Sequence, residues 1–348
     1  MTSSMLAEIR EAPALVAAAL REDADLYVAL GRALRARAPS FVATVARGSS
    51  DHAASYAAYL IGILTGRVTA SLPPSLVTRY DVKPQLAQAL VIAVSQSGAS
   101  PDLVRVMAAA RAAGAMSAGV VNATGSALGA EVDWVLPQRA GAEHAVAATK
   151  SFVLTLTAIA RLTAAWAEDA VLEAALARLP DRLEAALLCD WSAGLPVLSE
   201  PGGAGAYVVG RGPGLSIARE AALKLKETSY LHAEALSAAE IQHGPRAVVD
   251  RMFPVLAFGL ADAGGGDTRA LAADLVASEV PVLLAAPKTG GAWAERCGTL
   301  LPLPQPLHPL LDPIPAVLAF YVFAEALARR RGLDPDQPRG LRKVTKTL

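Results

Sequence analysis

Short apolar runs alternate with stretches of helical periodicity along the first half of this chain. Strands are predicted, in order, at residues 41–46, 89–94, 116–121 and 133–136. Helical patterns cover residues 1–38, 53–64, 101–113 and 145–167. The alternation predicts a parallel sheet with helices on both faces. Such sheets bind ligands at the carboxyl ends of their strands, so the loops after residues 46 and 94 are the expected place for a site.

The second half of the chain repeats the first at a shift of 164 residues. Residues 45–48 and 209–212 both carry the pattern Val-X-Arg-Gly, and the strand at 116–121 falls on residues 280–285. The polar residues 95–97 fall on Gly259-Leu260-Ala261, so the polar loop is not repeated. We therefore expect two similar domains, of which only the first carries the polar loop of a binding site.

Prolines, glycines and serines cluster around residues 190–203, where we place the join between the two folds. The expected organisation is a helical N-terminal segment, a first domain, a second domain and a non-helical tail that folds over the site. Their ranges are 1–38, 39–190, 204–332 and 333–348.

Composition argues against several classes of protein, among them disordered chains, nucleic-acid binders and membrane-anchored proteins. The 348 residues include 32 Lys+Arg and 32 Asp+Glu, with 53% hydrophobic residues, which excludes a disordered chain. Zero net charge argues against nucleic-acid binding and against a polybasic membrane anchor, but leaves a small anionic substrate open. Acidic residues in the first eleven positions argue against a signal peptide, and no uncharged apolar run is long enough to span a bilayer. Two cysteines, Cys189 and Cys297, indicate a reducing setting, so a soluble cytoplasmic protein is expected.

Two polar loops follow predicted strands. Residues 95–100 read Ser-Gln-Ser-Gly-Ala-Ser before a helix that begins near Pro101, and residues 47–50 read Arg-Gly-Ser-Ser. Hydroxyls and free N–H groups at a helix N-terminus favour an oxyanion such as phosphate. The alternative for each loop is a plain turn with a capping serine. Two such loops at one sheet edge favour a binding site.

A third candidate is the segment 220–245, where carboxylates and histidines are dense. Helical spacing places Glu220, Lys224 and Glu227 on one side, which a solvated helix face also explains. His243 precedes Gly-Pro at a forced turn, and the spacing of the histidines supports no metal site. A carboxylate with a histidine suits proton transfer beside a carbonyl, the chemistry of sugar isomerisation. In the tail, Lys343 is either solvated or an amine nucleophile.

These motifs together resemble a known family. The residues are Ser95-Gln-Ser-Gly, Ala147-Ala-Thr-Lys, the run 222–235, Gln242-His-Gly-Pro and Asp336-Gln-Pro-Arg. They resemble the isomerase half of glucosamine-6-phosphate synthase, a tandem sugar isomerase (SIS) architecture of two flavodoxin-like domains. The resemblance covers about residues 30 to 348.

The resemblance implies roles residue by residue. It assigns phosphate binding to Ser50, Ser95, Gln96, Ser97 and Ser100, with Ser100 in place of the usual threonine. It assigns backbone contacts with the sugar to Val146 and Ala147, while Ala148 stands where the synthase has a serine.

The catalytic roles come from the same resemblance. Glu227 matches the base that moves a proton between C1 and C2, and Glu240 matches a nearby carboxylate. His243 matches the ring-opening histidine, which relatives contribute across a dimer interface. Lys343 matches the Schiff-base lysine, although the residues after it depart from the synthase ending.

The resemblance also suggests a reaction. The synthase carries a glutaminase domain with a catalytic cysteine before its isomerase half, and residues 1–38 are too short for one. An isomerase half without an ammonia source resembles the second class of glucosamine-6-phosphate deaminase, which forms fructose 6-phosphate and ammonia, and we expect that reaction here. A homodimer with shared active sites and no metal or cofactor is expected. The alternatives are a galactosamine 6-phosphate deaminase, a fructosamine-6-phosphate deglycase, a plain ketose/aldose isomerase and a non-catalytic sugar-phosphate sensor.

Overall fold

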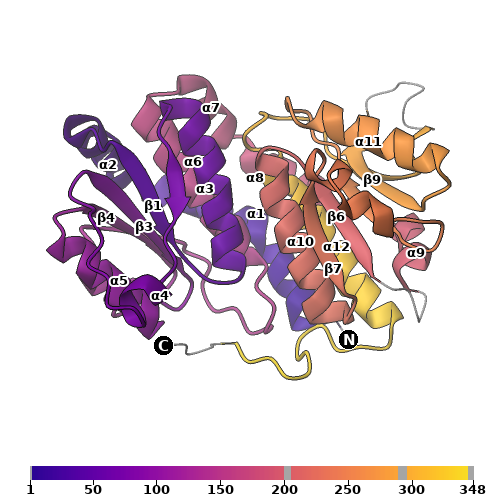
Figure 1. Ribbon diagram of the computed structural model, residues 1–348, viewed down its shortest axis with the longest axis horizontal. Helices are drawn as coiled ribbons and strands as arrows, with labels where there is room; N and C mark the ends of the chain where they lie inside the picture. Colours follow the sequence, from indigo (N-terminus) through magenta and orange to yellow (C-terminus); the bar gives the residue numbers. More distant parts are fainter. Residues whose placement is uncertain (1, 200–204, 289–295, 344–348) are drawn as a thin grey trace. The chain divides into compact units, whose positions relative to one another are not determined.

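The computed structural model describes residues 2–199, 205–288 and 296–343 (Figure 1). It divides into two compact units, each built on one sheet. The first-sheet unit comprises Ala14–Glu143, Lys150–Ala177 and Arg342–Leu348. The second-sheet unit comprises Met1–Pro13, His144–Thr149 and Arg178–Leu341. Helix α1 (Ser4–Glu22) contributes residues to both units.

The first-sheet unit alternates strands with helices. In chain order after α1, its elements are α2 (Ala24–Arg37), β1 (Phe41–Val45), α3 (Ser49–Thr65), β2 (Thr69–Ser71), α4 (Ser75–Thr78), β3 (Ala89–Ser95), α5 (Pro101–Ala112), β4 (Met116–Val121), the 3-10 helix η1 (Gly129–Glu131), β5 (Trp134–Pro137), α6 (Lys150–Ala167) and α7 (Ala170–Leu176).

The second-sheet unit has the same alternation. Its elements are α8 (Leu179–Leu187), η2 (Ser192–Gly194), α9 (Leu195–Ser199), β6 (Ala206–Gly210), α10 (Pro213–Ser229), β7 (Ala233–Ser237), η3 (Glu240–Gln242), η4 (Pro245–Val248), β8 (Val255–Phe258), α11 (Gly265–Ala277), β9 (Val282–Pro287), β10 (Thr299–Leu303) and α12 (Pro313–Arg330).

Both sheets are parallel throughout and share one topology. The strand orders are β2-β1-β3-β4-β5 and β7-β6-β8-β9-β10. In this flavodoxin-like order, the second strand of each sheet lies on one side of the first strand, and the third strand lies on the opposite side of the first strand. The crevice between the β1 and β3 loops, and between the β6 and β8 loops, is thus the topological switch point. The predicted fold class, two flavodoxin-like domains with helices on both sheet faces, is confirmed.

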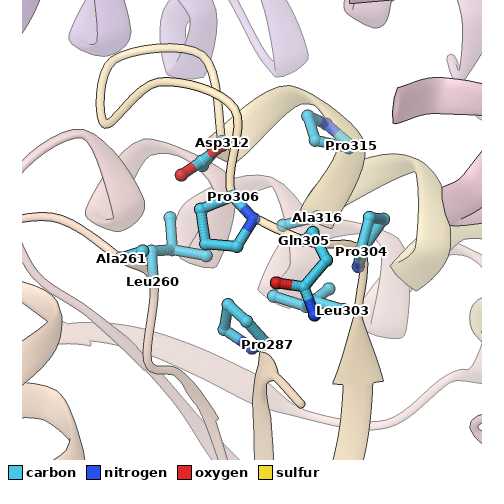
Figure 2. Close-up of a pocket in the computed structure, with 10 residues that line it drawn as sticks. All are labelled: Leu260, Ala261, Pro287, Leu303, Pro304, Gln305, Pro306, Asp312, Pro315 and Ala316. Carbon is cyan, nitrogen blue, oxygen red and sulfur yellow. The ribbon is translucent and has the colours of Figure 1, made fainter. Parts of the chain in front are cut away.

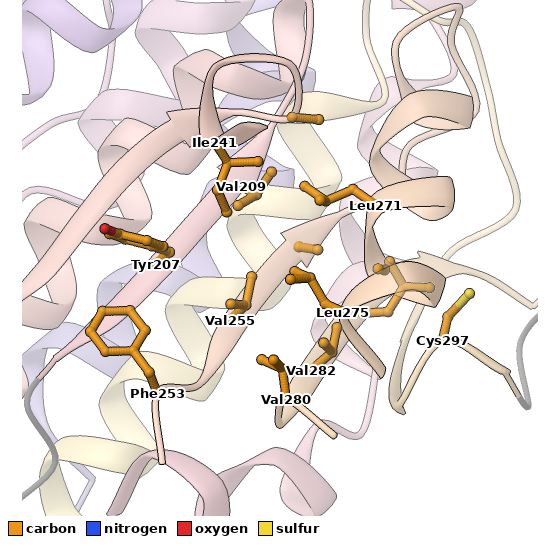
Figure 3. Packing of buried hydrophobic residues seen from close by; sticks show 14 of the residues in the cluster. Tyr207, Val209, Ile241, Phe253, Val255, Leu271, Leu275, Val280, Val282 and Cys297 are labelled. Carbon is orange, nitrogen blue, oxygen red and sulfur yellow. The ribbon is translucent and has the colours of Figure 1, made fainter. Parts of the chain in front are cut away.

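Each sheet is buried on both faces by helices, which explains its apolar strands. On one face of the second sheet, Tyr207, Val255 and Val282 pack with Leu271 and Leu275 of α11 (Figure 3). On the other face, Phe258 of β8 meets Phe320 of α12 with ring centroids 6.3 Å apart. Burying each such side chain contributes about 1.5–3 kcal/mol. All seven residues of β3 are buried in the same way in the first sheet.

The internal repeat is confirmed in the helices that follow the first strand of each sheet. Helix α3 begins at Ser49 and α10 at Pro213, and both their starts and their ends differ by 164 residues. Each helix is preceded by a glycine in the same left-handed conformation, with φ of 54° at Gly48 and 57° at Gly212. A side chain is strained at such a φ, so both positions favour glycine.

Some element boundaries differ from the sequence prediction. Helix α6 begins at Lys150 rather than near residue 145, because the N–H groups of residues 144–146 bond to Glu8 and to the Asp336 carbonyl instead of continuing a helix. Strands β2, β7, β8 and β10 were not predicted one by one, and β9 begins at Val282 rather than at residue 280. Within the described residues, no helix combines the length and the apolar character needed to cross a bilayer.

The contact between α2 and α6 gives a stability test. A Cβ atom at Gly31 of α2 would lie 2.4 Å from the Ala165 carbonyl oxygen of α6. We expect Gly31→Ala to destabilise the protein by about 1–3 kcal/mol, because the two helices must separate. In urea unfolding, the matched helical variant Gly62→Ala should be stabilising by up to about 1 kcal/mol, since the nearest atom to its Cβ is 3.9 Å away. Equal shifts in the two variants would contradict the close-packing argument.

Candidate functional site

The loop after β3 forms a compact turn that starts helix α5. The Gly98 N–H donates to Ser95 Oγ over 3.1 Å, and the Ala99 N–H donates to Ser97 Oγ over 3.3 Å. Ser100 occupies the N-cap position of α5 in an extended conformation, and its side chain makes no capping bond. The hydroxyl-rich turn thus lies at the positive end of a twelve-residue helix. Gln96 is half-buried, and its carbonyl accepts the Asn122 N–H over 3.1 Å.

Gly98 makes this turn possible. Its φ is +60°, and a Cβ there would lie 2.0 Å from Ser126 Oγ. A larger residue would therefore be strained and would also collide with the neighbouring loop.

The loop after β1 is tied to the start of α5 by an ion pair between the exposed Arg47 and the buried Asp102. Arg47 Nη2 lies 3.0 Å and Nε 3.1 Å from Asp102 Oδ2, and the Asp102 side chain is fully buried. Ser50, the other predicted residue of this loop, lies in the first turn of α3. The ion pair fixes the β1 and β3 loops against each other at the switch point. Both polar loops are thus brought to one sheet edge, as the sequence predicts.

The second sheet repeats the ion pair but not the polar loop. Arg211 after β6 pairs with Asp267 near the start of α11 over 2.7 Å. The carboxyl edge of this sheet holds a pocket of only about 10 Å³, whose lining includes Pro287, Pro304 and Pro306 (Figure 2). Asp312 also lines it, and burial raises the pKa of its carboxyl despite the N–H groups of Leu307 and His308.

Glu227 belongs to a charged cluster on α10. Lys224 Nζ bonds to a carboxylate oxygen of Glu227 and lies 3.3 Å from Glu220 Oε1. The Tyr321 hydroxyl of α12 donates to the same Glu220 oxygen over 3.1 Å. The Glu220 and Lys224 side chains are 0% and 1% exposed, whereas Glu227 is 21% exposed. The buried groups therefore orient a carboxylate that still reaches the surface.

Burial alone would lower the pKa of Lys224, but the carboxylates of Glu220 and Glu227 outweigh it and raise that pKa. Lys224 is therefore a permanent ammonium at neutral pH, and it is a fixed counter-charge for both carboxylates. The alternative of a solvated helix face does not hold for Glu220 and Lys224, which are buried in the core of the unit.

His243 and Glu240 lie at the exposed 3-10 helix η3. Glu240 begins it and His243 follows its last residue, and both side chains are exposed. In the described part of the chain no hydrogen bond or ion pair joins His243 to Glu227. The second-sheet unit by itself therefore does not bring the two predicted catalytic groups into contact.

The loop before α6 carries the predicted sugar contacts. Ala147 is buried, and the Val146 N–H donates to the Asp336 carbonyl over 3.0 Å. Glu8 accepts the N–H groups of His144 and Ala145. The loop is thus held by α1 and by the segment near the C-terminus, and the Val146 N–H is already occupied. Nothing in the residue spacing of Glu8 or Asp336 signals this support.

Lys343 is paired within the first-sheet unit. Its Nζ lies 2.7 Å from Glu143 Oε2, and the Glu143 side chain has no exposed surface. The residues after Lys343 lie outside the described part of the chain. Glu143 was not a sequence candidate, and its partner lies 200 residues away. Over the described residues, no group of three or more His, Cys, Asp or Glu side chains is arranged to hold a metal ion.

Comparison with known proteins agrees with this architecture. The SIS domain model matches residues 40–165 and 205–328. A glutamine–fructose-6-phosphate aminotransferase (isomerizing) of Gloeobacter violaceus is 34% identical over 353 residues, covering 97% of this chain and 58% of the relative. The chain thus spans a little over half the length of the curated relatives it matches.

Two solved structures are similar over nearly the whole chain. A proposed phosphosugar isomerase from Silicibacter pomeroyi DSS-3 is 40% identical with a TM-score of 0.90, covering 96% of this chain and 100% of that one. The C-terminal domain of glucosamine-fructose-6-phosphate aminotransferase from Francisella tularensis is 26% identical with a TM-score of 0.85, covering 97% and 99%. The chain belongs to the SIS domain family, with two SIS domains in tandem, and is similar throughout to the isomerase half of the aminotransferases.

Proposed function

We propose that this protein converts glucosamine 6-phosphate and water to fructose 6-phosphate and ammonia. The observation that carries the proposal is the carboxylate of Glu227, held by a buried lysine yet partly exposed. A general base for sugar isomerisation needs a fixed orientation and access to the substrate carbon. The similarity to isomerase halves that handle the same hexose phosphates supports this substrate class.

In the proposed reaction, the phosphate is bound by Ser50, Ser95, Gln96, Ser97 and Ser100. This interaction lies away from the reacting carbons, so its binding energy can position C1 and C2. His243 opens the sugar ring, acting in the site of a second copy in a homodimer. The backbone of Val146 and Ala147 contacts the sugar, and Glu240 lies near it.

The chemical steps use groups of the chain alone. Glu227 removes the proton from C2 and returns it to C1, which turns the aldose amine into a ketose imine. Lys343 displaces ammonia from that imine and forms a Schiff base, and water then hydrolyses it to fructose 6-phosphate. No metal or organic cofactor enters this chemistry.

A second candidate is plain isomerisation of a ketose or aldose phosphate. The 40% identical solved chain is described as a proposed phosphosugar isomerase, which favours this alternative over a sensor. The same Glu227 proton transfer would serve it, without loss of ammonia.

Ammonia release tests the reaction directly. With glucosamine 6-phosphate and no glutamine, we expect ammonia and fructose 6-phosphate to appear in equal amounts. Glu227→Gln should lower the rate by about 10²–10⁴-fold, because an amide cannot take the proton. The matched variant Glu234→Gln, at an exposed position of β7, should retain the rate.

Each other result has a definite meaning. Release only from galactosamine 6-phosphate would keep the mechanism and change the epimer. Interconversion of hexose phosphates without ammonia would favour the plain isomerase. Binding of hexosamine phosphates without turnover would contradict an enzymatic role, and near-normal turnover by Glu227→Gln would remove Glu227 from the proton transfer.

Gly98→Ala tests the phosphate loop. We expect at least a ten-fold loss of fructose 6-phosphate affinity in titration calorimetry, because the turn before α5 cannot keep its shape. Gly114→Ala is the matched control at the other end of α5. It also has a positive φ, 77°, but open space for a Cβ, so it should lose some stability and retain affinity. Equal affinity in both variants would place phosphate binding elsewhere.

Lys224→Met tests the buried ion pairs that Lys224 makes with Glu220 and Glu227. Removing the ammonium leaves Glu220 buried without its counter-charge, which should cost about 3–5 kcal/mol of unfolding free energy at pH 8. The loss should shrink at pH 5, where Glu220 can be protonated, and Glu220→Gln in the same chain should recover part of it. Lys226→Met, exposed on the same helix, should stay within about 0.5 kcal/mol of wild type.

The wild-type pH dependence follows from the raised pKa of Lys224. Its ion pairs stabilise the fold fully below the unfolded lysine pKa of about 10.4. They are lost as the pH rises through the higher pKa of the folded state. Urea unfolding from pH 8 to 12 should therefore show a loss of stability that Lys224→Met lacks. Parallel curves would contradict this ion-pair contribution.

A further inference from the structure

The proposed Schiff-base lysine belongs to a three-residue cluster in the first-sheet unit. Glu143 Oε2 accepts both Lys343 Nζ, over 2.7 Å, and Ser151 Oγ, over 2.8 Å. Glu143 Oε1 accepts the Ser151 backbone N–H over 3.1 Å. The carboxylate is therefore held at two oxygens, and Lys343 meets the one that also binds a hydroxyl.

Helix α6 fixes the position of Glu143. Ser151 lies in the first turn of α6, and its N–H is one that the helix itself leaves unpaired. By accepting that N–H, Glu143 caps the helix and sits at its positive end. The carboxylate thus has a set orientation that does not depend on Lys343.

Burial makes the pairing with Lys343 chemically consequential. The Glu143 side chain is 0% exposed and that of Lys343 is 24% exposed. A fully buried carboxylate is costly unless it is paired and hydrogen-bonded. A lysine side chain is ordinarily an ammonium near neutral pH, and an ammonium has no lone pair with which to attack a carbonyl. Before Lys343 can act, one of its protons must leave, and Glu143 Oε2 is an acceptor in contact with it.

We propose that Glu143 positions Lys343 and takes its proton when a keto sugar phosphate binds, an inference that rests on the proposed function. The proton passes from Nζ to Glu143 Oε2, which leaves a neutral amine and a neutral carboxylic acid. The amine lone pair forms the N–C2 bond, and the carbonyl π pair moves to oxygen. Glu143 returns its proton to that oxygen. The nitrogen then gives a second proton to the same oxygen, and water leaves as the C=N bond forms. The net change is ammonium plus ketone to protonated Schiff base plus water.

Borohydride trapping measures this step without the rest of the cycle. The full-length protein is mixed with fructose 6-phosphate and sodium borohydride, which reduces the Schiff base to a stable amine. Mass spectrometry of the Lys343 peptide then gives the trapping rate at each pH. Wild type should give a nearly level rate from pH 7 to 9, because the proton acceptor is built in.

Glu143→Gln removes the proton acceptor but keeps an oxygen for the Ser151 N–H. At pH 7 it should trap about 100-fold more slowly, and its rate should rise about ten-fold per pH unit toward the ordinary lysine pKa of about 10.4. Glu143→Asp should restore the level profile at a lower rate. Ser151→Ala removes only the hydroxyl and should also keep the wild-type profile. Glu173→Gln, an exposed carboxylate on α7, is the matched control for unchanged trapping.

Faster trapping by Glu143→Gln than by wild type would mean that Glu143 inhibits Lys343. If the ion pair only silenced Lys343, its removal would free the amine, and Glu143→Gln would trap faster than wild type. That result, or equal trapping at every pH, would overturn the proposal. Should Glu143→Gln fail to fold, a wild-type rate that rises ten-fold per pH unit would overturn it equally. The other titratable neighbours along the chain, His144, Lys150 and Arg342, are unchanged in all variants.

The two levels of the proposal fail in different ways. Ammonia release from glucosamine 6-phosphate without any trapping of Lys343 would overturn the roles of Glu143 and Lys343 and leave the proposed overall reaction standing. Absence of both ammonia release and trapping would overturn both. Trapping with the expected pH profile but no ammonia release would support Glu143 and Lys343 and contradict deamination.

Discussion

The parallel sheet is the constraint on which the chemistry of this fold depends. Its strands are buried on both faces, as the seven covered residues of β3 show, so most of their side chains are apolar. Since every strand runs the same way, all carboxyl ends lie on one edge, and side chains can reach a ligand only there. In the 2-1-3-4-5 order, the loops after the first and third strands diverge at this edge and leave a crevice between them. In the first sheet, the turn 95–100 and the Arg47–Asp102 ion pair lie at this crevice.

Burial also explains why the charged groups occur in clusters. An isolated charge inside a helix-covered sheet would cost several kcal/mol, so each buried carboxylate has a nearby cation or donors. Glu220 has Lys224 and Tyr321, and Glu143 has Ser151 and Lys343. In both clusters a fully buried member is joined to a partly exposed one. The buried member sets the orientation, and the partly exposed member, Glu227 or Lys343, is the group to which we assign a catalytic role.

The fold could be predicted from sequence because it rests on local patterns. Apolar runs near β1, β3 and β4, each followed by a helical period, are sufficient for a doubly covered parallel sheet. The polar turn 95–100 was also recognisable, since hydroxyls and a glycine between strand and helix are a local signal. The partners that come from distant parts of the chain were not. Glu143 and Lys343 are 200 residues apart, and Glu220 and Tyr321 are 101 apart, with no spacing rule to connect them. The start of α6 was misplaced for the same reason, because its capping by Glu143 and the bonds of Glu8 and Asp336 depend on tertiary contacts.

The two sheets show how one topology can be kept for different purposes. Both retain the positive-φ glycine before the first helix and the arginine–aspartate pair that ties two loops together. Both features lie at the switch point of their own sheet. The hydroxyl-rich turn 95–100 follows β3 of the first sheet, whereas Leu260, Ala261 and several prolines line the corresponding edge of the second sheet. The repeated helix has diverged in the same manner, since α10 carries the Glu220–Lys224–Glu227 cluster where α3 has Tyr56, Leu60 and Ile63. The two domains therefore share one packing arrangement, while each group of candidate site residues occurs in only one of them.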